Sequence, residues 1–211
     1  MILALETSTS MGSVALYDPA ESRMVWEQSF RSERSHNALI FRPLREVLRE
    51  CGGCLERVVV GTGPGSYSGI RVAIAVAGGL GVALGVPVAG GSSLEAFAPE
   101  GESCLVVGDA RRESFFAAKV VAGGESEDPI LLDEQGLKEA IVEACGFGWP
   151  VFSADATLWE RRRESGISEG YPTAGRLARR WARLSRECFE ERSNVPLEPH
   201  YLRAPYITTP K

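Results

Sequence analysis

The sequence predicts an α/β fold in which two halves of the chain repeat one order of elements. Short apolar runs of strand length alternate with longer stretches whose apolar residues recur at the helical period. In both halves the resulting order is strand, strand, strand, helix, strand, helix. The first strand of each half also ends at an acidic residue, Glu6 in the first half and Asp109 in the second. This duplication is the main indication of the fold.

The first half opens with three strands, because short apolar or alternating runs are separated by serines, a glycine and an Asp-Pro pair. The helix that follows contains Pro43, which indicates a kink or a later start. Gly52 and Gly53 end this helix. The expected strands are residues 2–5, 13–17, 24–30, 58–60 and 86–89, and the expected helices are residues 35–50 and 68–84.

A polar stretch around residues 99–103 is the expected boundary between two subdomains. Residues 1–100 are assigned to an N-terminal subdomain and residues 101–211 to a C-terminal one, whose last segment is free to return to the first. The expected strands of the second half are residues 104–108, 115–121, 129–132 and 150–152, and the expected helices are residues 137–145 and 173–189.

The composition excludes some classes of protein. With 44% hydrophobic residues in a chain of 211, there is enough apolar surface to bury a core. The net charge of -5 provides no overall positive field, so any contact with RNA is expected to be indirect or weak. Five cysteines without secretory spacing favour a reducing compartment, and Cys51-Gly-Gly-Cys54 lacks the second ligand pair of a zinc site. We expect no metal, no signal peptide and a cytoplasmic location.

One stretch, residues 72–91, carries no charge and has the length that a bilayer needs. It consists mostly of alanine, valine and glycine, is interrupted by Pro87 and lacks an aromatic belt. A buried helix that leads into a buried strand is therefore the expected structure, with no membrane contact.

Residues 61–71 read Gly-Thr-Gly-Pro-Gly-Ser-Tyr-Ser-Gly-Ile-Arg, between an expected strand and an expected helix. A glycine-dense turn at a helix N-terminus suits an anion, because backbone N–H groups can approach it. The segment is not a Walker P-loop, since no lysine lies between residues 1 and 118. It is not a dinucleotide fingerprint either, since Ser66 replaces the third glycine and Pro64 removes a donor. A tight turn and a ligand contact remain equal alternatives.

The next helix carries mostly small residues. Because each glycine inside a helix costs roughly 1 kcal/mol relative to alanine, its glycines indicate the close approach of another backbone. That backbone belongs to the helix at residues 35–50 or, as the favoured alternative, to another chain. Without a partner, the chain is expected to homodimerise through this surface. The expected partner surface lies within residues 1–100 and consists of His36, Leu39, Ile40, Leu44, Arg71, Gly78, Gly79 and Gly81.

Two such halves in tandem resemble the superfamily of actin, sugar kinases and heat-shock chaperones. The resemblance implies an α/β, actin-like (ASKHA, ribonuclease H-like) duplicated fold with two subdomains, in which hairpins from both halves hold phosphates in a cleft. Glu6 stands where the superfamily pattern expects Asp, so the carboxylate is displaced by about one bond length. The favoured interpretation of the hydroxyl-rich turn at residues 7–12 is structural, and an ion pair is favoured in the second hairpin. The alternative is a set of weak nucleotide contacts from Thr7, Ser8, Thr9, Asp109 and Arg111.

Five segments resemble the TsaB (YeaZ) family in order and spacing, over nearly the whole chain. They are ALETS at residues 4–8, SHN at 35–37, GPGSYSGIR at 63–71, DARRE at 109–113 and PHYLR at 199–203. The resemblance implies a scaffold and activating subunit that pairs, through helices of its N-terminal domain, with the larger catalytic paralogue TsaD. It also implies an associated ATPase, TsaE, in a complex that transfers threonylcarbamoyl to the adenosine beside the tRNA anticodon.

The histidines support the absence of catalysis. The catalytic paralogue holds its metal with a His-x-x-x-His pair, whereas His36 is followed four residues later by Ile40, and His200 is the other histidine. We therefore expect no catalytic residues and no cofactor. The alternative is a small actin-like ATP-binding phosphotransferase or ATPase that uses Glu6, Thr7 and Asp109.

A third alternative is an independent RNA-binding module that uses a row of arginines on one helix. These arginines recur at spacings of three or four and have acidic neighbours, so a solvated face is the favoured interpretation. They are Arg176, Arg179, Arg180, Arg183 and Arg186.

Overall fold

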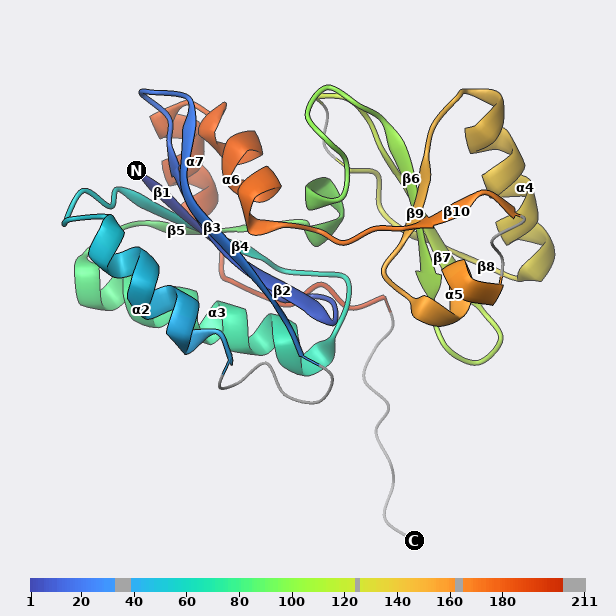
Figure 1. Cartoon of the computed structure of the whole chain (residues 1–211), viewed down its shortest axis with the longest axis horizontal. Helices are drawn as coiled ribbons and strands as arrows, with labels where there is room; N and C mark the ends of the chain where they lie inside the picture. The colour runs from blue at the N-terminus through green and yellow to red at the C-terminus, as the bar shows by residue number, and fades with distance from the viewer. Residues whose placement is uncertain (33–38, 124–125, 162–164, 203–211) are drawn as a thin grey trace, which may run out of the picture.

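Two lobes lie side by side in the computed structural model, and each is built around one five-stranded sheet (Figure 1). The structure describes residues 1–32, 39–123, 126–161 and 165–202. His36 of the expected partner surface lies outside these described residues.

The first sheet has the strand order β3-β2-β1-β4-β5. β1 is antiparallel to β2 and parallel to β4, so it is the central strand where the direction of pairing changes. Its side chains alternate between two apolar clusters, with Ile2 and Ala4 on one face and Leu3 and Leu5 on the other. The strands are β1 Ile2–Glu6, β2 Met11–Asp18, β3 Arg23–Arg31, β4 Arg57–Gly61 and β5 Val88–Gly91.

The second sheet repeats this plan. Its order is β10-β9-β6-β7-β8, with β6 antiparallel to β7 and parallel to β9. Counted from its own first strand, this is the connectivity of the first sheet, so the predicted duplication and the actin-like fold class are confirmed. The strands are β6 Cys104–Asp109, β7 Phe115–Val120, β8 Ile130–Leu132, β9 Val151–Ser153 and β10 Ile167–Glu169.

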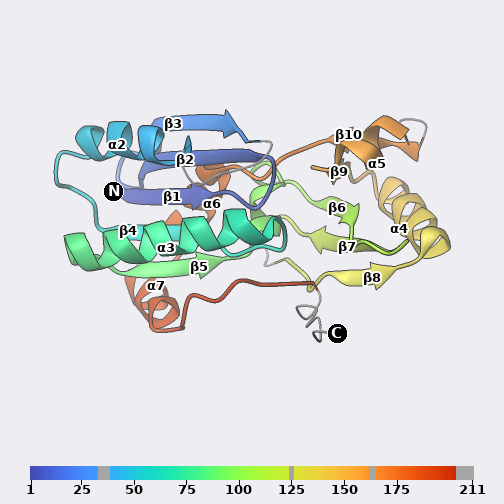
Figure 2. The same ribbon diagram turned by 90° about the horizontal axis from the view of Figure 1, so that it is seen from below.

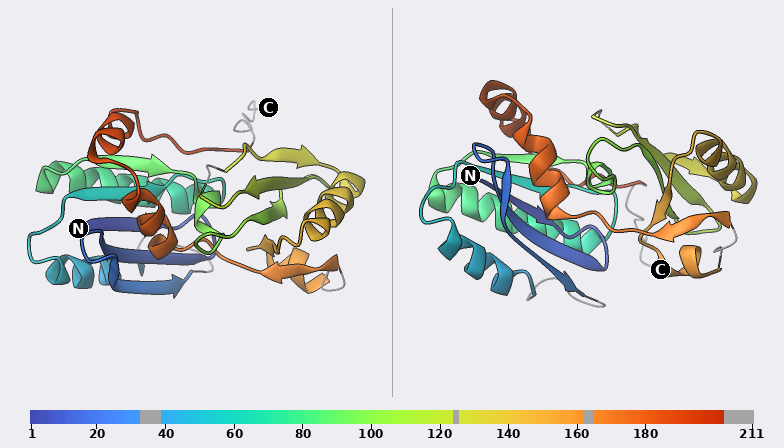
Figure 3. Two further views of the ribbon diagram at one scale, coloured as in Figure 1. Left: turned by 90° about the horizontal axis from the view of Figure 1, so that it is seen from above. Right: turned by 45° about the horizontal axis from the view of Figure 1, so that its top comes forward.

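Helices cover both faces of the first sheet (Figures 2 and 3). α2 Phe41–Glu50 and α3 Tyr67–Leu84 contribute to the cluster around Leu3 and Leu5. α6 Ala174–Ala182 packs on the opposite face, and α7 Arg186–Ser193 contacts β5. Pro43 falls in the first turn of α2, where a missing N–H breaks no helical hydrogen bond, so the later start is the correct alternative.

The expected helix at residues 173–189 is wrong, because the structure divides it into α6 and α7. Ser185 caps the second helix by accepting a hydrogen bond from the Cys188 N–H, and the chain turns before it. Both helices contact the first sheet although they follow the second in sequence. The boundary at residue 100 therefore separates the two sheets. α6 and α7 come after this boundary in sequence but pack on the first sheet.

Three short elements were not expected from the sequence. They are η1 Ser93–Ala96, α5 Ala156–Arg161 and β10. The expected helix at residues 137–145 is part of α4 Glu134–Gly146, which covers one face of the second sheet through Leu137, Ile141 and Ala144.

α3 is far less buried than expected. Its buried residues are Gly69, Ile70, Ala73 and Ala77. Among the described helices it alone is long and apolar enough to cross a membrane by length and composition, and 22% of that window is buried. The expectation of a buried helix is therefore wrong, because only one narrow stripe of α3 faces the sheet.

Candidate functional site

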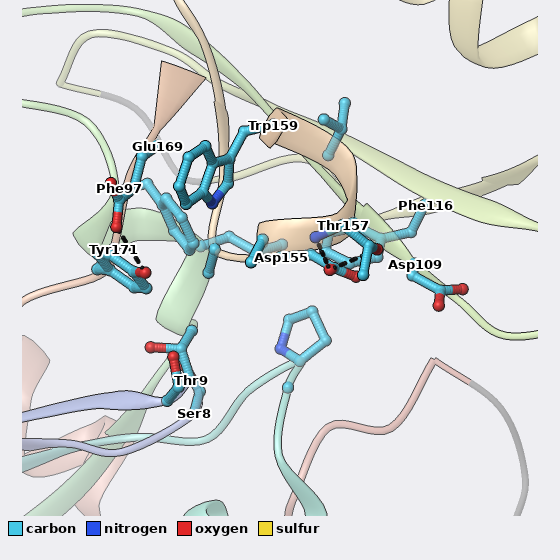
Figure 4. Close-up of a pocket in the computed structure, with 18 of the residues that line it drawn as sticks. Ser8, Thr9, Phe97, Asp109, Phe116, Asp155, Thr157, Trp159, Glu169 and Tyr171 are labelled. Atoms are coloured by element: carbon cyan, nitrogen blue, oxygen red, sulfur yellow. Dashed lines mark hydrogen bonds between the residues drawn. The ribbon is translucent and has the colours of Figure 1, made fainter. Parts of the chain in front are cut away.

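A cavity of about 800 Å³ lies between the two lobes (Figure 4). The hairpin turn after β1 and the hairpin turn after β6 both reach it, as the superfamily resemblance implies. The rest of the lining comes mainly from η1, α5, β7, the loop between β4 and α3, and the ends of β3 and β10. Its polar lining includes Ser8, Thr9, Asp109, Arg111, Asp155 and Glu169, and its aromatic lining consists of Phe97, Phe116, Trp159 and Tyr171.

The first hairpin uses its own hydrogen-bonding groups. The Ser8 N–H donates to Glu6 Oε1 over 2.6 Å, and the Met11 N–H donates to Thr9 Oγ1 over 3.3 Å. Thr7 Oγ1 donates to the Gly69 carbonyl over 2.7 Å and is buried. Ser8 and Thr9 therefore line the cavity, whereas Thr7 ties the hairpin to α3.

Glu6 is fully buried below this turn. Burial raises the pKa of its carboxyl, and hydrogen bonding by Ser8 lowers it to a smaller extent. Oε2 makes no hydrogen bond within the described part of the chain, and a Cβ at Gly61 would overlap it. Position 61 therefore requires a glycine. The Glu6 carboxyl is buried and does not line the cavity.

The glycine segment after β4 packs directly on the first hairpin. The Ser66 N–H donates to the Ser8 carbonyl over 2.6 Å, and a Cβ at Gly65 would overlap that carbonyl oxygen. The Gly63 N–H donates to Ser93 Oγ, and the Gly69 N–H donates to the N-cap Ser66. Of the two alternatives for this segment, the tight turn accounts for these contacts.

The second hairpin holds an internal ion pair. Asp109 accepts the Arg111 N–H over 2.6 Å, and the Arg111 guanidinium lies 3.3 Å from the other carboxylate oxygen. Arg111, Arg112 and Glu113 have φ values of 66°, 55° and 57°, a left-handed run that non-glycine residues rarely adopt. The Ala110 N–H is also used, by the Ser114 carbonyl. Asp109 and Arg111 thus face the cavity as a neutralised pair.

The arginines of α6 are engaged within the protein. Arg176 donates to the Phe97 carbonyl over 2.8 Å, and Arg180 pairs with the nearly buried Glu95 over 3.1 Å. Arg179 and Arg183 both pair with Glu100. The acidic neighbours are therefore present, but Arg186 lies on α7 and pairs with Glu190, so the five arginines do not share one solvated helix face.

Several residues of the expected partner surface are buried in the structure, whereas others are exposed. Ile40 is fully buried, Leu44 is 7% exposed, and a Cβ at Gly81 would overlap Val88 of the chain's own sheet. Leu39 is exposed, and Gly78 and Gly79 face open space. The Arg71 guanidinium lies 4.6 Å from the Tyr67 ring centroid, at the start of α3.

Two exposed apolar side chains next to these residues were not expected from the sequence. Phe41 is 55% exposed and Val82 is 89% exposed. Val82 lies one helical turn after Gly78, so this spacing could have predicted that both residues lie on the same face of α3. Phe41, Leu44 and Leu48 line a second cavity, of about 650 Å³, whose other lining residues are Arg42, Arg45 and Arg49.

The aromatic side of the cleft was also missed. Phe97 follows η1, and Trp159 belongs to α5, so both depend on elements that the sequence did not predict. Tyr171, whose hydroxyl donates to Glu169 over 2.8 Å, follows the unexpected strand β10. Arg203, the last residue of the PHYLR motif, lies outside the described chain, but the His200 N–H donates to the Thr62 carbonyl over 2.7 Å.

Comparisons with known proteins agree on the family. Residues 30–140 match the family model described as TsaD, tRNA N6-adenosine threonylcarbamoyltransferase. A Haemophilus influenzae protein named tRNA threonylcarbamoyladenosine biosynthesis protein TsaB is 33% identical over 57% of this chain and 53% of its own length. A Bacillus subtilis protein of the same name is 31% identical over 47% of this chain and 44% of its own.

A solved structure matches almost the whole chain. It is a Pseudomonas aeruginosa protein described as similar to the peptidase YeaZ, with a TM-score of 0.70 and 25% identity over 96% of this chain and 99% of that one. The matches to the two curated relatives cover about half of their lengths. The family model covers more than half of this chain, so the chain belongs to the family that it describes, and within that family to the TsaB/YeaZ proteins.

Proposed function

We propose that this chain is a non-catalytic scaffold subunit that binds a TsaD-type catalytic paralogue in tRNA threonylcarbamoyladenosine biosynthesis. The names of the relatives support the pathway, and the family model, which describes the transferase, supports a paralogous partner. In this proposal the chain works in the cytoplasm and a TsaE-type ATPase joins the pair. Contact with tRNA is indirect or weak, and the chain homodimerises when it is alone.

The observation that carries the proposal is the exposed apolar face of α3. Nothing lies within 4 Å of a Cβ built at Gly78 or Gly79, and Val82 beside them is 89% exposed. An apolar helix face of this kind is normally covered by another element. The two glycines allow a partner helix to approach the backbone closely. This face is therefore the proposed centre of the docking surface.

The neighbouring helix α2 extends the same surface. Leu39 and Phe41 are 43% and 55% exposed. Arg42, Arg45 and Arg49 line the cavity next to Phe41. An apolar centre with a basic rim fits a partner that presents an apolar helix flanked by acidic residues.

The geometry of the cleft supports a role without catalysis. A phosphate cradle needs free backbone N–H groups, but those of Ser8, Met11 and Arg111 already donate to side chains of their own hairpins. Glu6, at the position of the superfamily acid, is fully buried. These contacts favour the scaffold over the ATPase alternative.

Gly79→Glu tests the docking surface. A charged side chain on the exposed face should abolish co-purification with a tagged TsaD-type subunit, because it would be buried without a partner charge. The isolated variant should remain folded, since glutamate replaces glycine in an exposed helix position and is the better helix former. Circular dichroism checks the fold.

Gly146→Glu is the matched control. Gly146 is also a helical glycine that faces open space, but it lies in α4 of the other lobe. We expect this variant to co-purify as the wild type does. If the Gly79→Glu variant co-purified as the wild type does, α3 would not be part of the interface.

A further inference from the structure

Arg71 is the only charged residue in α3. It is exposed, and so are Ala75, Gly79 and Val82, which follow it at intervals of three or four residues along the helix. Residues at these intervals lie on one face of a helix. The exposed apolar face of α3 therefore has a single positive charge near its N-terminal end, roughly 12 Å along the helix axis from Gly79.

Tyr67 holds the Arg71 side chain in place. The guanidinium lies 4.6 Å from the Tyr67 ring centroid and donates a hydrogen bond to Tyr67 Oη. Within the described residues, Arg71 takes part in no ion pair with a carboxylate. A side chain that is already ordered loses less conformational entropy on binding, so Arg71 is suited to pair with a charged group of another molecule.

The segment at residues 197–202, which contains most of the PHYLR motif, supports Tyr67 in turn. The Tyr201 ring stacks on the Tyr67 ring, with 5.2 Å between the centroids and an angle of 20° between the planes. The His200 N–H donates to the Thr62 carbonyl, so the segment is fixed to the glycine loop that precedes α3. Tyr201 Oη is buried and makes no hydrogen bond within the described part of the chain, so the ring rather than the hydroxyl makes the contact.

We infer, on the basis of the proposed docking function, that Arg71 pairs with the carboxylate of an aspartate or glutamate on the helix that the TsaD-type subunit packs against α3. Tyr67 and Tyr201 act through Arg71 as positioning residues. The acidic residue of the partner lies roughly 12 Å along the axis from the point where the partner backbone approaches Gly79. Because the arginine fork matches the two oxygens of one carboxylate, this pair also sets the register in which the two helices meet.

A carboxylate fits this surface better than the phosphates of a nucleic acid. Binding of nucleic acid depends on several cations that neutralise successive phosphates. The other residues of α3 are uncharged, so its single positive charge adjoins an apolar face. An apolar helix face with one arginine near its end matches a partner helix that is apolar and carries one acid.

Arg71→Gln tests the ion pair, and the variant should remain folded because glutamine is a good helix former at an exposed position. Its affinity for a tagged TsaD-type subunit, measured with the full chain by isothermal titration calorimetry at about 50 mM salt, should be about tenfold weaker than that of the wild type. The difference should shrink at about 500 mM salt, because salt screens a charge pair at the rim of an interface. Arg186→Gln on α7, where Arg186 pairs with Glu190, is the matched control and should bind as the wild type does. Equal affinities of the Arg71→Gln variant and the wild type at low salt would overturn the inference.

Two substitutions of Tyr201 test its positioning role. Tyr201→Phe keeps the ring and should bind as the wild type does, whereas Tyr201→Ala should weaken binding about threefold. The double variant Tyr201→Ala with Arg71→Gln should bind no more weakly than Arg71→Gln alone, because Tyr201 acts through the guanidinium. Losses that add in full in the double variant would contradict the positioning role.

The outcomes distinguish this ion pair from the proposed function. If Gly79→Glu abolishes binding and Arg71→Gln does not weaken it, docking on α3 stands and the ion pair is wrong. If neither substitution changes binding of the TsaD-type subunit, both are wrong. Loss of tRNA binding by the Arg71→Gln variant, with unchanged binding of the TsaD-type subunit, would identify Arg71 as a phosphate contact and would also overturn the inference.

Discussion

At the residue scale, Glu6 is the acidic side chain whose environment differs most from water. It is fully buried, and its Oε1 accepts the Ser8 N–H while Oε2 lies against Gly61. Burial raises the pKa above the ordinary value of 4.5, so folding favours the protonated form. The stability that Glu6 contributes is therefore fully present below that ordinary value and is lost as the pH rises through the folded-state pKa.

Glu6→Gln should remove this dependence on pH. The free energy of unfolding of the variant, relative to the wild type, should rise as the pH increases above the ordinary value of 4.5, because only the wild type must then bury a charge. Urea denaturation of both proteins at several pH values measures the difference. A constant difference across this range would show that burial of the Glu6 carboxylate has no cost.

At the element scale, the loop between β4 and α3 connects three parts of the first lobe. It contacts the hairpin through Gly65 and Ser66, it meets η1 through Ser93, and a Cβ at Gly63 would lie 2.8 Å from the His200 carbonyl oxygen. The glycines are required because backbone groups approach where a side chain would stand. The same loop leads directly into α3, one face of which is exposed.

Gly65→Ala should destabilise the protein by roughly 2 kcal/mol or more, because the new Cβ overlaps the Ser8 carbonyl and neither backbone can move freely. Gly146→Ala, at a helical glycine in open space, should leave stability unchanged or raise it by up to about 1 kcal/mol. Thermal or urea unfolding measures both variants. A Gly65→Ala protein as stable as the wild type would show that the loop is not held against the hairpin.

The sequence predicted long elements better than short ones. Alternation and helical periodicity located the main strands and α3, because their burial patterns extend over several residues. The break between α6 and α7 was missed, since it contains no glycine or proline and depends on Ser185 as a cap. The cleft could be predicted only on its hairpin side, because Phe97, Trp159 and Tyr171 lie in or beside short elements.

The same limit applies to the surface of α2. Ile40 and Leu44 were expected to be exposed, yet both face the sheet, while Leu39 and Phe41 point outward. Two apolar faces lie on this segment, and helical periodicity alone does not say which one meets the core. Only the position of α2 over β2 and β3 decides it.

At the scale of the whole molecule, the duplicated fold provides two separate surfaces. The cleft between the lobes has hairpins in which the Ser8 and Arg111 N–H groups donate to side chains of their own hairpins. The outer face of the first lobe carries the exposed apolar side of α3. We propose that the catalytic paralogue docks on this outer face.

Hydrogen exchange on the chain alone and in complex with a TsaD-type subunit tests this claim most directly. The backbone amides of α3 around Gly78, Gly79 and Val82, and those of α2 near Phe41, should exchange more slowly in the complex, because a partner helix covers them. Unchanged exchange throughout α2 and α3, with protection confined to the cleft hairpins, would contradict it.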